Sequence, residues 1–150
     1  MADEQLEIQK QFRQQQEKYV YYVLALSVAA IGFAVTRTTG TTLKISQIPV
    51  GFAVLFWGFS IYCGLTFMQY IISSLWVVNE MYKVRDGLFP EVGNNQALQE
   101  SALKGLHDAI ETNSDKANKL AKWQSRLFYL GIVCFIVWHI IEMFYFKPTH

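Results

Sequence analysis

A chain of 150 residues with a net charge of +1 has room for one domain, and it lacks the basic surplus that a nucleic-acid-binding protein needs. Three stretches are apolar enough to cross a bilayer, because an uncharged stretch beyond about 18 residues predicts a membrane-spanning helix. We therefore expect an all-α integral membrane protein with three transmembrane helices and a small cytoplasmic helical bundle, forming a single membrane domain over 1–150.

The chain begins with a polar segment, residues 1–18, in which Ile8 and Phe12 are the only good apolar pair. We expect a short N-terminal cytoplasmic helix here. Its three basic and four acidic residues give a net charge of −1, whereas a secretory signal peptide opens with a positive segment. The apolar stretch 19–36 should therefore stay in the protein as the first transmembrane helix. A short polar loop over 37–47 then predicts an antiparallel hairpin with the next span.

The second span is the longest. Residues 48–78 are 31 residues without a charge, and as a helix they would extend about 46 Å against a hydrocarbon core of about 30 Å. Neither Gly nor Pro interrupts residues 66–86, and Gly87 followed by Pro90 is a typical stop signal. One helix over 48–86 is predicted, the second transmembrane helix continued by a cytoplasmic stalk.

The stalk should pack on the next segment, 95–125, which is rich in helix formers and has Asn95 as a plausible cap. Residues 112–115 match the capping-box pattern, so either a new helix starts there or the helix bends. The apolar residues that share one face of the stalk, and that we expect to be buried, are Ile71, Leu75, Val78 and Tyr82.

The third transmembrane helix is expected over 127–146. Three spans put the N-terminus and the segment 79–126 on one side, with ten basic residues, and the other side has three. Because basic residues accumulate on the cytoplasmic side, we expect the N-terminus in the cytoplasm and the C-terminus outside, in a bacterial inner membrane.

A polar stripe in the second span carries the main functional hypothesis. Its members lie on one helical face and turn toward protein or water when a helix is in lipid: Tyr62, Thr66, Gln69 and Ser73. They could line a pore in an oligomer, or they could hydrogen-bond the other two spans. The sequence leaves both interpretations open.

A pattern of small residues occurs in the first two spans. Small residues let helix backbones approach closely, and they recur as Ala25, Ala29 and Gly32 in the first span and as Ser60 and Gly64 in the second. These could serve contacts within one chain or between chains.

His139 and Glu142 share a face of the third span. They could handle protons, since intramembrane ionisable residues are candidates for function. Alternatively they lie at the headgroup level, because Glu142 is close to the end of the span.

We therefore expect a small homo-oligomeric membrane protein that forms a pore or alters membrane permeability and has a cytoplasmic sensing or docking bundle. The alternative is a non-conducting membrane anchor or adaptor. An enzyme, a cofactor, a metal site and a nucleic-acid partner are not expected. Expected partners are membrane lipid, further copies of the chain and a cytosolic protein at 71–125. In general form the chain is similar to small multi-span proteins that bacteria encode beside stress and phage-defence genes, a likeness that assigns no residue roles.

Overall fold

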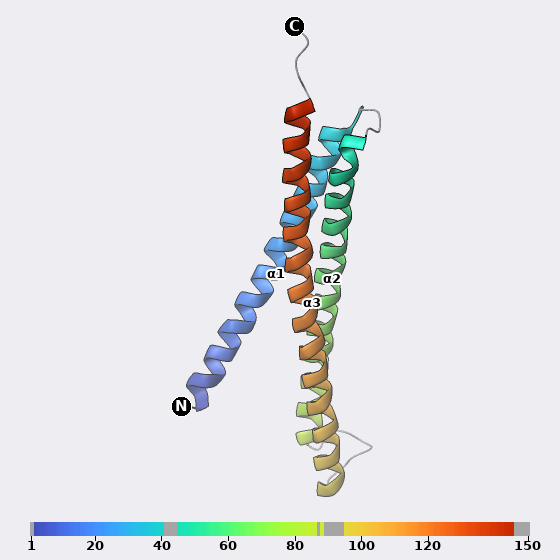
Figure 1. The fold of residues 1–150 in the computed structure, drawn as a ribbon. Coiled ribbons are helices and arrows are strands. Elements are labelled where there is room, and N and C mark those ends of the chain that lie inside the picture. Colours follow the sequence, from blue (N-terminus) through green and yellow to red (C-terminus); the bar gives the residue numbers. More distant parts are fainter. Residues whose placement is uncertain (1, 41–44, 87, 89–94, 146–150) are drawn as a thin grey trace. The chain divides into compact units, whose positions relative to one another are not determined.

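A computed structural model describes residues 2–40, 45–86, 88 and 95–145. Within these residues the protein is all-helical, without a strand (Figure 1). The elements are α1 (Ala2–Thr38), the 3-10 turn η1 (Ile45–Gln47), α2 (Ile48–Arg85) and α3 (Gln96–Tyr145). The helices α1, α2 and α3 are each long and apolar enough to cross a membrane. The expected all-α class with three candidate spans is thus confirmed.

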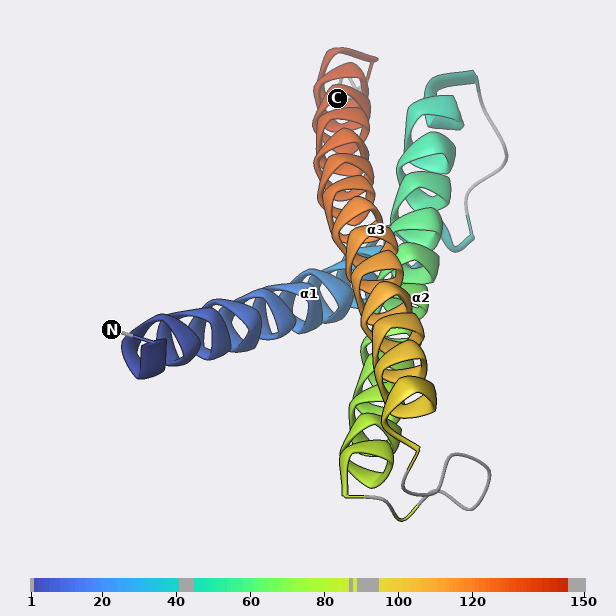
Figure 2. The same ribbon diagram turned by 90° about the horizontal axis from the view of Figure 1, so that it is seen from below.

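The chain divides into two compact units, and the division falls within α2 and α3. The first unit comprises Met1–Gly64 and Ala121–His150, so it holds α1, the beginning of α2 and the end of α3. The second unit is Leu65–Leu120, a hairpin of 65–85 of α2 and 96–120 of α3, which lie side by side in Figure 2. We refer to the second unit as the helical hairpin.

The uninterrupted helix expected over 48–86 is confirmed by α2, which has 38 residues. A hydrogen bond from the Leu88 amide to the Lys83 carbonyl (2.9 Å) closes its end, and such an i to i−5 bond is typical of a Schellman cap. The stop signal itself, Gly87 and Pro90, lies outside the described residues. The predicted cap of the next helix is also confirmed, because Asn95 Oδ1 accepts a bond from the Ala97 amide (3.2 Å).

Two predicted helix boundaries do not occur. The N-terminal helix and the first span form one helix of 37 residues, because Gln, Glu, Lys and Arg continue a helix readily. The capping-box pattern at 112–115 starts no new helix, since α3 runs through it without interruption over 50 residues. There Asn113 Nδ2 instead donates to Ser73 Oγ of α2 (3.4 Å). Packing on a neighbouring helix outweighs the propensity penalty, which is only about 0.5 kcal/mol for each such residue.

The prediction of which residues of α2 are buried in the hairpin is partly wrong. Leu75 is 60% exposed and Tyr82 is 55% exposed, whereas Ile71 and Val78 are half-buried. The buried residues of α2 in the hairpin lie instead at steps of seven and three, on the face that packs against α3. The buried members are Phe67, Ser74, Val77 and Val84 of α2 and Ala117 of α3.

In the first unit, buried residues recur at steps of three, four or seven along each helix, the spacing of knobs-into-holes packing. These residues are Val20, Val23, Ser27 and Ala34 in α1; Val50, Ala53, Trp57, Ser60 and Gly64 in α2; and Ala121, Gln124, Phe128, Gly131 and Trp138 in α3. The indole of Trp57 lies over Gly131, where an added Cβ would be 2.5 Å from Trp57 Nε1. The absence of a side chain at Gly131 therefore lets α2 and α3 approach.

We predict that Gly131→Ala destabilises the protein by about 1–3 kcal/mol, because the rigid indole cannot move aside in a packed core. Gly105→Ala is the matched control on the same helix, since nothing lies within 4 Å of a Cβ added there. The control should be neutral or up to about 1 kcal/mol more stable. Unfolding in detergent, followed by tryptophan fluorescence, measures both changes. Equal stability of the two variants would contradict the close contact of Trp57 with Gly131.

Candidate functional site

A buried polar junction joins all three helices of the first unit. The side chain of Gln124 is fully buried, and its Nε2 donates to the Val20 carbonyl of α1 (3.3 Å). Ser60 Oγ of α2 donates to the backbone carbonyl of Gln124 (2.9 Å). A Cβ at Gly64 would be 2.5 Å from Gln124 Nε2, so glycine makes room for the amide. Three helices are thus held at one level by two hydrogen bonds.

Sequence reasoning missed Gln124, which follows three lysines and a tryptophan on a segment that reads as solvated. Its burial could have been predicted from spacing. Ala117, Ala121, Gln124 and Phe128 follow one another at intervals of three and four residues and therefore share one face of the helix. A glutamine at such a position is enclosed when the helix packs. Its Oε1 has no hydrogen-bond partner among the described residues, so the junction is only half satisfied.

The polar stripe of α2 does not turn as a whole toward α1 or α3. Gln69 and Ser73 are exposed, Tyr62 is 65% exposed, and Thr66 is half-buried. Ser73 accepts a bond from Asn113 of α3. Tyr62 belongs to the first unit and the other three to the hairpin, so the stripe extends beyond the unit that contains all three helices.

The small-residue pattern separates into two groups. Ser60 and Gly64 are buried at the polar junction and serve contacts within the chain. Ala25, Ala29 and Gly32 are exposed on α1, and nothing lies within 4 Å of a Cβ added at Gly32. The small residues of α1 that pack are instead Ser27 and Ala34.

The predicted ionisable pair lies at the end of α3. His139 is exposed and Glu142 is half-buried, and Glu142 Oε2 has no hydrogen-bond partner within the described part of the chain. One turn away, the buried Trp138 Nε1 also has none there. No bond joins His139 to Glu142 among those recorded between described residues.

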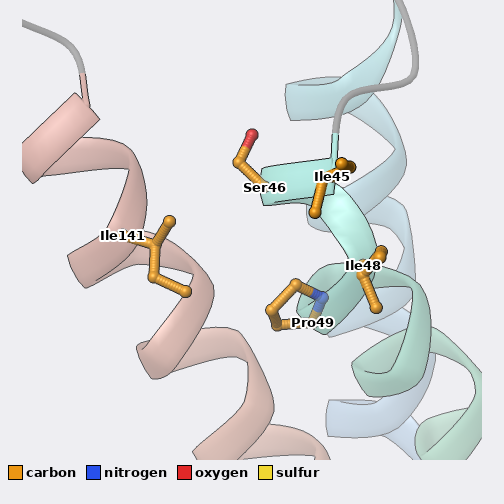
Figure 3. Close-up of a pocket in the computed structure, with 5 residues that line it drawn as sticks. All are labelled: Ile45, Ser46, Ile48, Pro49 and Ile141. Carbon is orange, nitrogen blue, oxygen red and sulfur yellow. The ribbon is translucent and has the colours of Figure 1, made fainter.

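An apolar hollow of about 630 Å³ lies near this end of the first unit. Figure 3 shows Ile141 of α3 facing the start of α2 across it. The lining residues are Ile45, Ser46, Ile48, Pro49 and Ile141. A single hydroxyl among apolar side chains offers neither a nucleophile with a base nor a paired carboxylate, so the hollow has no catalytic constellation.

The described residues contain no group of three or more His, Cys, Asp or Glu side chains that could hold a metal ion. Comparison with protein-family models, curated proteins and solved structures finds no match to this chain.

We predict that Gln124→Glu destabilises the protein by several kcal/mol, because it replaces the amide donor with a buried carboxylate that faces the Val20 carbonyl. The loss should be largest at about pH 7 and smaller at about pH 4, where a protonated carboxyl can again donate. Unfolding midpoints in detergent at the two pH values measure it. Gln96→Glu is the isosteric control, since Gln96 is exposed at the start of α3. A pH-independent loss, or the same loss in the control, would contradict the junction.

Proposed function

We propose that the chain is a three-span membrane anchor whose helical hairpin stands outside the hydrocarbon core as a docking platform. The observation that carries this proposal is the charge of α3 within the hairpin. Residues 100–119 contain eight ionisable side chains, and all are exposed: Glu100, Lys104, His107, Asp108, Glu111, Asp115, Lys116 and Lys119. A helix with so many exposed charges is very costly to place in lipid.

The pairing of the two helices then carries part of α2 out of the membrane. Lys116 Nζ lies over the ring of Tyr70 (5.8 Å), and Asn113 donates to Ser73. Residues 70–73 of α2 are therefore level with the charged part of α3, although α2 itself has no charge there. In this proposal the second half of the uncharged stretch 48–78 is in water or at the headgroups.

A hairpin in that position has apolar side chains that water does not favour. Ile72 is 66% exposed, Leu75 is 60% exposed and Trp76 is 63% exposed. Large apolar patches on a surface outside lipid mark sites of interaction. This supports the adaptor function over a conducting one and supports a protein partner at the hairpin.

A pore is the second candidate, and the exposed residues Tyr62, Gln69 and Ser73 favour it. In an oligomer these residues would face a water-filled axis. The bond of Ser73 with Asn113 puts this part of α2 level with the charged part of α3, at the mouth of such a pore rather than at its narrowest part. The adaptor requires no conduction path and is the function we prefer.

We also propose that the hairpin and the N-terminus are cytoplasmic and the membrane is a bacterial inner membrane. The ten basic residues on that side against three on the other support this orientation. The C-terminal residues 146–150, which we expect outside, are beyond the described residues.

Release of an ion and of a small dye from liposomes distinguishes the adaptor from the pore. The adaptor predicts no release above that of empty liposomes, and the same result for Gln69→Leu. A pore predicts release that Gln69→Leu reduces at equal oligomer content, because an apolar mouth hinders the entry of water. Release by the unaltered protein that depends on Gln69 would contradict the adaptor.

A further inference from the structure

Two segments of the first unit carry exposed aromatic and basic side chains, and the structure places them at one level. We call this set the interfacial belt: Lys18, Tyr19, Tyr21 and Tyr22 of α1, and Lys122, Trp123, Arg126 and Tyr129 of α3. The bond from Gln124 to the Val20 carbonyl joins the two segments, and the phenols of Tyr19 and Tyr129 share a second hydrogen bond. Aromatic residues gathered in this way are typical of the headgroup level of a bilayer.

The two cations of α3 in the belt share a face with Tyr129. Lys122, Arg126 and Tyr129 follow one another at steps of four and three, so they are neighbours on the face that reaches Tyr19 of α1. No acidic residue occurs in α3 over 116–141. Within the described part of the chain, neither cation has an ion pair with a carboxylate. The face therefore has positive charge that the chain itself does not balance.

Arg126 is held in a position that suits an anion. Its guanidinium carbon lies over the indole of Trp123, 5.7 Å from the ring centroid. Stacking of this kind uses the flat face of the guanidinium and leaves its N–H edge to donate hydrogen bonds. That edge matches two oxygens of a phosphate, which an arginine binds with two parallel bonds.

We propose that this face binds the headgroup phosphate of an anionic phospholipid. Arg126 and Lys122 pair with the phosphate, and the Tyr19–Tyr129 pair supplies one further donor, because two phenols that share one bond retain one hydroxyl proton. Basic faces beside membrane spans bind anionic headgroups in this way. The inference rests on the proposed function, since residues 121–126 are at headgroup level only if the hairpin is outside the hydrocarbon core.

The apolar continuation of the face favours a lipid as the occupant. Four residues beyond Tyr129, Val133 is 56% exposed, and four residues beyond Tyr22, Leu26 is 55% exposed. An occupant of the whole face is therefore anionic at one end and apolar beyond it. A phospholipid has this form. A free phosphate has no apolar part, and an acidic protein segment in water would not reach Val133 or Leu26.

Binding of lipid to the full chain in detergent, measured by native mass spectrometry, tests the proposal. The probes are phosphatidylglycerol and phosphatidylcholine with the same acyl chains, and the competitors are inorganic phosphate and an oligoglutamate peptide. We expect the first phosphatidylglycerol to bind about tenfold more tightly than phosphatidylcholine, equivalent to about 1.4 kcal/mol. Neither competitor should displace it.

Substitutions at exposed positions locate the site without disturbing the packed core. Lys122→Gln/Arg126→Gln should abolish the preference for phosphatidylglycerol. Lys10→Gln/Arg13→Gln is the matched control, because it removes the same two residue types from exposed positions of α1 outside the belt, and it should keep the preference. Arg126→Lys should lower the preference several-fold, because an ammonium binds phosphate as a point charge and lacks the two parallel bonds.

Three results would overturn the lipid site. Equal affinity for the two lipids would show that the face does not select an anionic headgroup. The same loss in both double variants would assign the preference to the overall charge of the chain. Displacement of phosphatidylglycerol by inorganic phosphate or by the oligoglutamate peptide would assign the face to a soluble anion.

Reaction of Leu75→Cys with a charged maleimide distinguishes a failure of this inference from a failure of the proposed function. It is carried out in permeabilised cells, in a variant in which Ala replaces Cys63 and Cys134. Leu75 is in the hairpin and 60% exposed. If it reacts while phosphatidylglycerol is not preferred, the platform stands and the lipid site is wrong. If it does not react, the proposed function fails, and this inference fails with it because headgroups would not reach Lys122.

Discussion

The length of the helices is the constraint on which the rest of the account depends. α2 has 38 residues and extends about 57 Å, and α3 has 50 residues and extends about 75 Å, against a hydrocarbon core of about 30 Å. A helix cannot shorten to fit a bilayer. The part of α2 that remains beyond the core needs cover other than lipid, although its sequence alone reads as a continuation of the span. In the proposed function, the charges of α3 within the hairpin mark that part.

The polar junction at Gln124 joins the three helices of the first unit at one level. The amide of Gln124 reaches α1, the hydroxyl of Ser60 reaches α3, and Gly64 leaves space for the Gln124 amide. In an apolar environment such bonds are each worth about 0.6 kcal/mol on average, so their main consequence is register rather than stability. Gly131 under Trp57 fixes the same register by shape. Packed in this way, α2 turns its small and polar residues inward at this level and an uncharged face outward.

The sequence predicted where the helices lie in the chain better than it predicted which residues of each helix are buried. Uncharged length identified the three candidate spans, and the absence of Gly and Pro over 66–86 predicted the continuous α2. The cap at Asn95 was predictable because a side chain and its own neighbours determine it. The capping box at 112–115 was misleading, since a local pattern carries no information about a distant helix such as α2.

The burial of individual residues was less predictable because it depends on which face of a helix meets its neighbour, and hydrophobicity alone does not show that. Leu75 is apolar but lies off the packed face of α2 and is exposed, whereas Ser74, the residue before it, is polar and is buried. Ser74 satisfies its own hydroxyl by donating to the Tyr70 carbonyl (2.9 Å), which lowers the penalty of burial. Gln124 was missed for a related reason, because its partner is a backbone carbonyl of another helix and no sequence motif marks that bond.

The depth of Leu75 and Leu55 in a bilayer tests the central claim most directly. Both are leucines on α2 with similar exposure, 60% and 57%. A nitroxide label at each position reports its contact with oxygen, which concentrates in the hydrocarbon core, and with a nickel chelate, which stays in water. The account predicts that the label at Leu55 contacts oxygen preferentially and the label at Leu75 contacts the chelate. A label at Leu75 that is as deep in hydrocarbon as the label at Leu55 would contradict it.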